Sequence, residues 1–329
     1  MKTPETEVLT GNIIMTRIRL ARNVYGAPFS LTDMDLSEEI IKNVSRSLVN
    51  FGSFDLYRMA ELSEERAESM KEKHLISSRL MKNPAGAALI DENEGVSVMI
   101  GEEDVLREQC FKKGLCLYEV YDKLDRIDDE ICKNTDIAFD KDLGFLTECP
   151  TNLGTGLRAS VMLHLPFLEA SKELGAISDS ISKIGFTVRG MYGEGTKAEA
   201  SLYQISNEVT LGISEKNAID NLKIIANQLI EKEREERKSA DKIKIADISN
   251  RALAILKSAR ILSSSELIKL ISEIKIGVST GEINVKNELL TSILFENQPY
   301  TIMCKYGNLS SKERDEKRAE LIRERIKDI

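Results

Sequence analysis

The hydrophobic pattern divides the chain into two differently patterned parts. From about residue 10 to 212, short β-branched and apolar runs alternate with stretches of helical spacing. The runs predict strands at 13–20, 87–90, 96–100, 144–147, 186–189 and 201–205. The stretches between them predict helices at 36–51, 63–73, 103–116, 117–132 and 156–174.

From residue 213 onward only the helical pattern remains. Apolar side chains recur at helical spacing in 222–229 and 248–262. Ser263 with Glu266, and Ser310 with Glu313, have the capping-box spacing that opens a helix. The charged stretch 231–238 indicates a solvated helix end. We therefore expect an α+β domain over 1–212 and an all-helical domain over 213–329.

Composition narrows the class of protein. The 329 residues include 46 Lys and Arg against 54 Asp and Glu, and the net charge of −8 disfavours nucleic acid as a direct partner. With 42% hydrophobic residues the chain is not broadly disordered. We find no signal-like start and no apolar run long enough for a membrane, and expect a cytoplasmic protein. Five scattered cysteines and two histidines predict neither a metal site nor a disulfide framework.

Two early segments combine arginine with acidic groups. In TRIRLAR, Arg17 and Arg19 share one face of the predicted strand, where they repel each other unless an anion lies between them. That segment is either a solvated strand face or a clamp for polyphosphate. In EEDVLR, Glu103 and Arg107 form either an ordinary helical ion pair or part of a catalytic site.

Two later segments combine glycine with arginine. CPTNLGTGLRAS (149–160) predicts a turn into a helix, a place that suits an anion, with Arg158 near the helix start. Cys149 in this segment is either inert or reactive. In VRGMYGEG (188–195), three glycines surround Glu194 above Arg189, which indicates a hairpin or a loop that closes over a ligand.

Together, five arginines, two carboxylates and a glycine-rich loop are what phosphoryl transfer from a nucleotide requires. CPTNLGT followed by GLRAS, with TRIR and EED-x-x-R upstream, resembles the ATP:guanidino phosphotransferase (phosphagen kinase) family. The resemblance implies an antiparallel sheet flanked by helices. It also implies that the substrate ATP, with Mg²⁺, gives its γ-phosphoryl group to a guanidinium nitrogen.

The order of the domains and a late motif refine the resemblance. Phosphagen kinases carry a helical domain before the catalytic one, whereas here a helical domain follows it and RDEKRA (314–319) fits an R-D-x-x-R-A pattern. Both features resemble bacterial protein arginine kinases, which phosphorylate arginine side chains and mark proteins for the Clp protease. This implies protein substrates, the Clp machinery, an activator and a homodimer or larger homo-oligomer as partners.

The resemblance also implies roles for single residues. Arg17, Arg19, Arg107, Arg158 and Arg189 match arginines around the ATP phosphates, and His74 matches a nucleotide-contacting histidine. Glu103 and Glu194 match the carboxylates that handle the guanidinium, and Cys149 a reactive cysteine near it. Arg314, Asp315 and Arg318 match a regulatory pocket for phosphoarginine. Neighbours in the same segments complete the implied nucleotide site: Thr16, Ile18, Ala159, Ser160, Val161, Met162, Gly190, Met191, Tyr192, Gly193 and, again, Glu194.

Three departures and two alternatives remain open. Met15 stands where the family usually has serine, Gly101 where it has asparagine and Val105 where it has histidine. The same catalytic set would serve a kinase of free arginine or another small guanidine. A weakly active, phosphoarginine-binding adaptor is the third possibility. Outside the motifs, we expect His164 to be a satisfied core histidine on an apolar helix.

Overall fold

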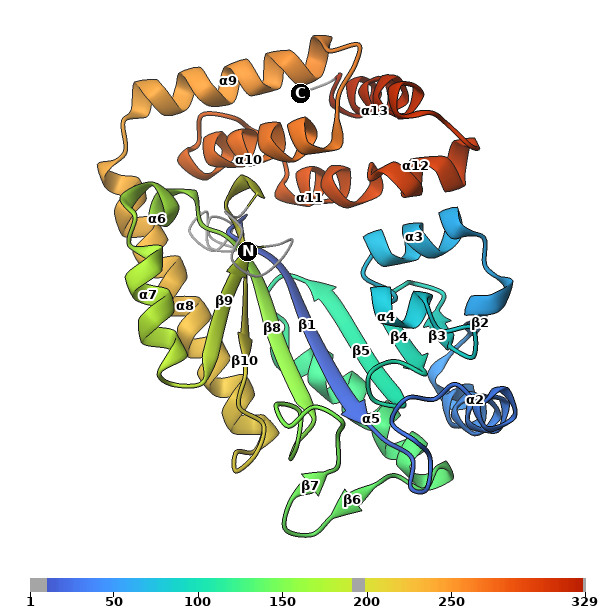
Figure 1. Cartoon of the computed structure of the whole chain (residues 1–329). Coiled ribbons are helices and arrows are strands. Elements are labelled where there is room, and N and C mark those ends of the chain that lie inside the picture. Colours follow the sequence, from blue (N-terminus) through green and yellow to red (C-terminus); the bar gives the residue numbers. More distant parts are fainter. Residues whose placement is uncertain (1–10, 191–198, 328–329) are drawn as a thin grey trace.

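The computed structural model describes residues 11–190 and 199–327. An eight-stranded antiparallel sheet forms its centre (Figure 1), in the order β2-β3-β4-β5-β1-β8-β10-β9. A separate hairpin pairs β6 with β7. The strands are β1 (Ile13–Arg22), β2 (Phe54–Arg58), β3 (Ala87–Asp91), β4 (Val96–Ile100), β5 (Leu106–Lys113), β6 (Phe139–Asp140), β7 (Gly144–Phe145), β8 (Leu157–His164), β9 (Phe186–Gly190) and β10 (Leu202–Asn207).

Helices cover one face, one edge and one end of the sheet. Figure 1 shows α5 behind the sheet, α6–α8 along the β9 edge, and α9–α13 across the end where β1 begins. The helices of the sheet-containing part are α2 (Met34–Leu48), α3 (Glu64–Glu72), α4 (Ser78–Met81), α5 (Leu117–Asn134), α6 (Pro166–Ser171), α7 (Leu174–Ser182) and α8 (Glu215–Ser239). The remaining helices are α9 (Lys242–Ser258), α10 (Ser264–Thr280), α11 (Asn287–Glu296), α12 (Pro299–Tyr306) and α13 (Ser311–Ile326).

Strand β1 shows how the sequence separates the core from the site. Its side chains alternate, so that Ile18 and Leu20 are buried in the main core while Arg17 and Arg19 lie on the opposite face. The core face packs against α2, α5 and α8. One face of β1 therefore stabilises the fold, and the other is available for chemistry.

The C-terminal helices have a core of their own and a small apolar junction with the sheet. Their core is built on side chains of α9, α10, α11 and α13. At the junction, Ile14 and Met162 from the sheet contact Ile268 and Leu294 from the helices. Both predicted capping positions are confirmed, since Ser263 and Ser310 accept hydrogen bonds from the backbone N–H groups of Glu266 and Glu313. The domain boundary at residue 212 stays a prediction, but α8, beyond it, packs in the main core.

The structure confirms the antiparallel sheet flanked by helices and corrects two predicted helices. Residues 106–113 form β5 instead of a helix over 103–116, and 157–164 form β8 instead of the start of a helix over 156–174. Strand β8 lies between β1 and β10 and is buried on both faces, so its sequence shows no alternation. Strand β2, at the sheet edge, was not predicted.

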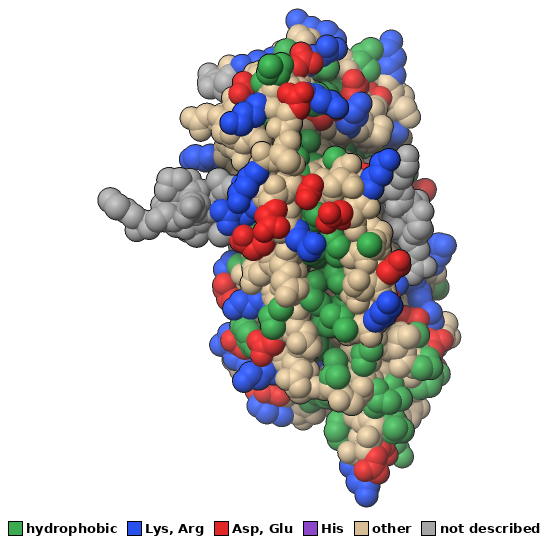
Figure 2. Space-filling view, turned by 90° about the vertical axis from the view of Figure 1, so that its left-hand side faces the viewer, with side chains coloured by type: hydrophobic (Ala, Val, Ile, Leu, Met, Phe, Trp, Pro, Cys, Tyr) green, Lys and Arg blue, Asp and Glu red, His purple; other side chains and the backbone are tan. Residues whose placement is uncertain are grey.

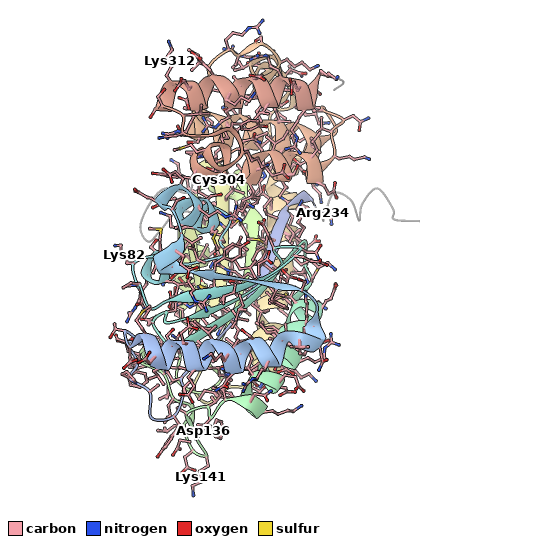
Figure 3. All side chains as sticks on the ribbon, turned by 90° about the vertical axis from the view of Figure 1, so that its right-hand side faces the viewer. Lys82, Asp136, Lys141, Arg234, Cys304 and Lys312 are labelled. Atoms are coloured by element: carbon pink, nitrogen blue, oxygen red, sulfur yellow. The ribbon has the colours of Figure 1, made fainter. Side chains whose placement is uncertain are left out.

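Apolar side chains are exposed on one side of the sheet-containing part. Figure 2 shows hydrophobic side chains gathered on the sheet-containing part, on the side of α6–α8. Exposed apolar side chains of the segments on that side include Ile184, Val209, Leu211 and Ile224. Figure 3 shows Lys141, in the turn of the β6–β7 hairpin, at the end of the molecule opposite the C-terminal helices.

Candidate active site

Five arginines from four strands, β5, β1, β8 and β9, lie on one face of the sheet, with β10 between β8 and β9. Arg17 and Arg19 lie on β1, and Arg19 is paired directly with Arg158 of β8. Arg107 lies on β5, where it is paired with Ala21 of β1. Arg189 comes from β9. The sheet thus gathers arginines that are up to 172 positions apart (189 − 17) in the sequence.

The charges of this cluster are only partly balanced within the protein, since Arg107 pairs with Glu102 and Glu103, and Arg189 pairs with Glu208. Burial and the charges of Arg107 and Arg158 lower the pKa of Arg17 to about 10. Burial, and then Arg17, Arg107 and Arg158, lower the pKa of Arg19 well below its ordinary value. Burial and Arg189 lower the pKa of Arg158. The Nε atoms of Arg17, Arg19 and Arg158 are buried without a hydrogen-bond partner. Such a cluster is a site for a polyanion.

The E-E-D motif places its three acids in three different settings. Glu102 is 3% exposed and its Oε1 accepts a hydrogen bond from Arg107 Nη1 at 2.6 Å. The Glu103 side chain is 33% exposed, and its Oε2 lies 3.5 Å from Arg107 Nη2. The backbone N–H of Glu103 donates to Glu102. Glu102 therefore holds Arg107 and the backbone of Glu103, while the Glu103 carboxylate remains open to a ligand.

Asp104 fastens the cysteine-containing loop to this motif. Its carboxylate accepts hydrogen bonds from the side-chain amides of Asn23 and Asn152 and from the backbone N–H of Glu148. Cys149 lies between Glu148 and Asn152 in the sequence, and its Sγ is 3.0 Å from Thr151 Oγ1. Neither Glu102 nor Asp104 was predicted as a site residue, although both belong to the E-E-D motif that was recognised.

A cavity of about 450 Å³ joins these groups. Its walls include four of the five arginines, the carboxylate-bearing Glu103 and the thiol of Cys149. Arg17 lies next to it on the same face of β1. The predicted association of arginines, glutamate and cysteine is thus present as one cavity, which can hold phosphate groups beside a carboxylate.

His74 lies at the far end of the same face, in a strained backbone position. It follows α3 with φ of 60°, where its N–H donates to Lys71 and the next N–H to Met70. This is the Schellman position that glycine usually occupies. Burial and the charges of Arg17 and Arg19 lower the pKa of His74 to about 4, so the ring is neutral. Its Nε2 is buried and without a partner.

Several predicted nucleotide contacts face away from the cavity. The side chains of Ile18, Ala159 and Val161 lie in the main core, and Thr16 Oγ1 donates to the carbonyl of Gly114. Their side chains cannot line the site, because the strand alternation turns them to the other face. Ser160 donates to the Arg17 carbonyl, Met162 lies at the junction with the C-terminal helices, and Gly190 ends β9. The predicted residues Met191, Tyr192, Gly193 and Glu194 lie outside the described residues.

The structure shows the setting of all three sequence departures. Gly101 has φ of +82° and a Cβ there would lie 2.7 Å from Asn83 Nδ2, whose amide bridges the carbonyls of Leu31 and Gly101. Val105 is buried in the main core. Met15 lines a second cavity near His74. None of the three removes a charged group from the arginine and glutamate set.

The RDEKRA motif does not place all three of its predicted pocket residues at the surface. Arg318 is 1% exposed, and it donates to the carbonyls of Asn297 and Leu262 and to Asp315 Oδ1 at 2.5 Å. Arg314 donates to Ser311 Oγ. Arg318 thus packs inside the C-terminal helices, and of the three residues predicted for the pocket only Arg314 and Asp315 are partly exposed.

His164 is a satisfied core histidine, as expected, but it lies on β8 and not on a helix. Its Nε2 lies 2.8 Å from Ser272 Oγ of α10. Within the described ranges, no three His, Cys, Asp or Glu side chains are arranged to hold a metal ion. None of the described helices has the length and apolar content that a membrane span requires.

Comparison with known proteins assigns both parts of the chain. Residues 36–236 match the family described as "ATP:guanido phosphotransferase, C-terminal catalytic domain", and residues 242–329 match "Protein-arginine kinase McsB C-terminal domain". The protein-arginine kinases of Clostridium kluyveri and Clostridium acetobutylicum are each 44% identical to this chain. These matches cover 96% of the chain and, respectively, 95% and 96% of the relatives.

A solved structure agrees with the sequence matches. The duplicated taurocyamine kinase from Schistosoma mansoni with bound transition state analog components has a TM-score of 0.62 and 26% identity. The match covers 81% of this chain and 40% of that chain.

Proposed function

Because this chain belongs to the ATP:guanido phosphotransferase family, we propose that it transfers the γ-phosphoryl group of ATP to arginine side chains of proteins. Its relatives of closely similar length are named protein-arginine kinases, which favours a protein substrate over free arginine. The observation that carries the proposal is the row of five arginines beside Glu103.

The geometry supports a division of work within the site. Arg17, Arg19, Arg158 and Arg189 would neutralise the phosphates of MgATP, and Arg107 would bridge the phosphates and Glu103. Magnesium, bound with the nucleotide, would neutralise part of the phosphate charge. The arginines would position the nucleotide and neutralise its charge, and these two effects dominate phosphoryl transfer.

Glu103 would handle the substrate guanidinium. A guanidinium keeps its proton far above neutral pH, because its pKa is very high, and it is a poor nucleophile while protonated. The Glu103 carboxylate would orient one nitrogen and accept its proton as that nitrogen bonds to the γ-phosphorus and ADP leaves. Cys149 lines the same cavity and would contact the guanidinium. The second predicted carboxylate, Glu194, remains a prediction from the family resemblance.

A transfer assay tests the proposed function. The protein is incubated with [γ-³²P]ATP, Mg²⁺ and either a protein substrate or free arginine. We expect label on the protein, and we expect acid to remove it because the P–N bond of phosphoarginine is acid-labile. Label on free arginine alone would favour the small-molecule kinase. Phosphoarginine binding without any transfer would favour the adaptor.

The regulatory assignments belong to the same proposal. Arg314, Asp315 and Arg318 would form a phosphoarginine-responsive element, with Arg314 and Asp315 at the surface and Arg318 holding them from within. Arg314→Ala should weaken the binding of added phosphoarginine and leave ATP binding unchanged. We further propose a cytoplasmic, oligomeric enzyme that works with an activator and marks proteins for Clp proteolysis, as the family resemblance implies.

A further inference from the structure

A second cavity, of about 490 Å³, lies where the C-terminal helices meet the sheet. Met15 and Phe111 line it from the sheet, His74 from the end of α3, and Thr291 and Phe295 from α11. Figure 1 shows α11 and α12 lying across the end of the sheet at β1 and above α3. The cavity is therefore built jointly by the two parts of the chain.

This cavity continues the row of phosphate-site arginines. Met15, Arg17 and Arg19 follow one another at every second position on the same face of β1. Two strand residues advance by about 7 Å, so Met15 and Arg19 are about 13 Å apart along the strand. A nucleotide whose phosphates lie at Arg19 would have its base near Met15.

The corner of the cavity between His74 and Phe295 suits an uncharged aromatic ring, while four lysines and two glutamates also line the cavity. His74 is neutral, and its buried Nε2 lacks a partner. The Phe295 ring meets the His74 ring edge to face, with centroids 6.3 Å apart and an angle of 72° between the planes. The two rings form a corner that offers one apolar face and one hydrogen-bonding group.

We propose that Phe295 of the C-terminal helices forms part of the nucleotide-base pocket, so that these helices complete the ATP site. The inference rests on the proposed function, because it requires the arginine row to hold the phosphates. It adds a residue from outside the matched catalytic region, which ends at 236. Recognition of the base then depends on how the C-terminal helices sit on the sheet.

A hydrogen-bonded contact fixes the part of the helices that carries Phe295. The Glu72 carboxylate accepts hydrogen bonds from the backbone N–H groups of Tyr300 and Thr301, at 3.0 and 2.8 Å, in the first turn of α12. Glu72 is two residues from His74, and Phe295 is five residues before Tyr300. Figure 3 shows Cys304, farther along α12, at the underside of the helical layer above α3, and its Sγ lies 3.4 Å from the Glu65 carbonyl.

Calorimetric titration of two ligands tests the inference. ATP carries a base and inorganic tripolyphosphate does not, while both present a phosphate chain to the arginines. Since stacking of a base on an aromatic side chain contributes about 1–3 kcal/mol, Phe295→Ala should weaken ATP binding roughly tenfold and leave tripolyphosphate binding unchanged. In kinase assays the KM for ATP should rise with little change in kcat.

Matched variants exclude a general loss of structure. Phe295→Tyr keeps the ring and should bind ATP like the wild type. Phe295→Leu keeps apolar volume without the aromatic ring, and should show the same selective loss if Phe295→Ala does not fold. Phe139→Ala removes an exposed aromatic side chain in the remote β6–β7 hairpin and should change neither affinity.

The outcomes separate this inference from the proposed function. Unchanged ATP binding in both Phe295→Ala and Phe295→Leu would overturn the inference. An equal loss of ATP and tripolyphosphate binding would also overturn it, because Phe295 would then support only the fold of the site. If the wild-type protein bound neither ligand, the proposed function itself would fail.

Discussion

Glu102 and Glu103 are adjacent and chemically identical, yet their surroundings give them different tasks. Glu102 is buried and its carboxylate is occupied by Arg107 and by the backbone of Glu103. The Glu103 side chain lines the cavity, and the backbone N–H of Glu103 donates to Glu102. A substrate guanidinium can therefore reach only the second of these carboxylates.

Glu103→Gln should abolish most transfer while leaving ATP bound. The amide keeps the shape of the side chain but cannot accept the proton, and general-base catalysis contributes about 10²–10⁴-fold. We expect kcat to fall at least about 100-fold, with ATP affinity measured by calorimetry nearly unchanged. Glu102→Gln, unlike Glu103→Gln, should weaken ATP binding, because it loosens Arg107. Near-normal turnover of Glu103→Gln would remove Glu103 from the mechanism.

Arg158→Ala should weaken ATP binding without destabilising the empty protein. The lowered pKa of Arg158 means that its charged form is disfavoured in the folded state, by burial and by Arg189. Removing it takes away a phosphate ligand and also relieves repulsion. We expect ATP affinity to fall by about tenfold or more, in line with a charge-assisted contact of about 1.5–3 kcal/mol, and the unfolding temperature without ligand not to fall. A large drop in that temperature with unchanged ATP affinity would contradict the assignment.

At the scale of the element, the sequence predicted which residues form the site better than it predicted their secondary structure. Arg107 and Arg158 were identified by their motifs, but both were placed on helices and both lie on strands. Glu103 and Arg107 are four residues apart, the spacing of an ion pair on a helix, and they do form an ion pair. Arg107, however, is the second residue of strand β5. Sequence spacing could not distinguish these cases, because pairing with β1 and β4 decides the conformation of β5.

Helix α8 carries a buried acid that should make stability depend on pH. Glu233 Oε2 accepts a hydrogen bond from the N–H of Leu168 at 2.8 Å, and its Oε1 from that of Phe167, in the first turn of α6. Burial raises the pKa of Glu233 from an ordinary 4.5 to about 7, although these two N–H groups lower it. Over that range the folded protein keeps a proton that the unfolded chain has lost.

The free energy of unfolding should therefore fall as pH rises from about 4.5 to 7, by on the order of 3 kcal/mol from this group. Glu233→Gln should remove this contribution. Denaturant unfolding of both proteins at several pH values measures it as the difference between them. Parallel curves for the wild type and the variant would show that Glu233 does not titrate in this range.

At the scale of the whole molecule, packing divides the chain differently from composition. The sequence changes to a purely helical pattern after residue 212, but α8 buries Leu222, Ala226 and Leu229 in the core of the sheet. A fragment ending at residue 240 should therefore unfold cooperatively, whereas one ending at 212 should not. Circular dichroism during heating distinguishes them, and both lack α9–α13, so the comparison isolates α8. Equal cooperativity would restore the boundary at 212.

The site as a whole was predictable only where a motif records it. TRIR, EED and CPTNLGT each contribute directly to the cavity, so the arginines, Glu103 and Cys149 could be found. Phe295 and Glu72 belong to no such motif, because their positions depend on how α11 and α12 pack against α3. Arg318 shows the reverse case, since its motif was recognised but its burial was not predictable.

The central place of β1 has a consequence for how the chain acquires its structure during synthesis. This strand is synthesised before both of its partners, β5 and β8, which begin only at Leu106 and Leu157. Pairings so distant in sequence carry a high entropic cost and form slowly. The arginines of β1 therefore stay apart from Arg158 until β8 has been made. Until then the nascent protein exposes the apolar face of β1 and cannot form the complete arginine cluster, and chaperones act on such transiently exposed apolar surface.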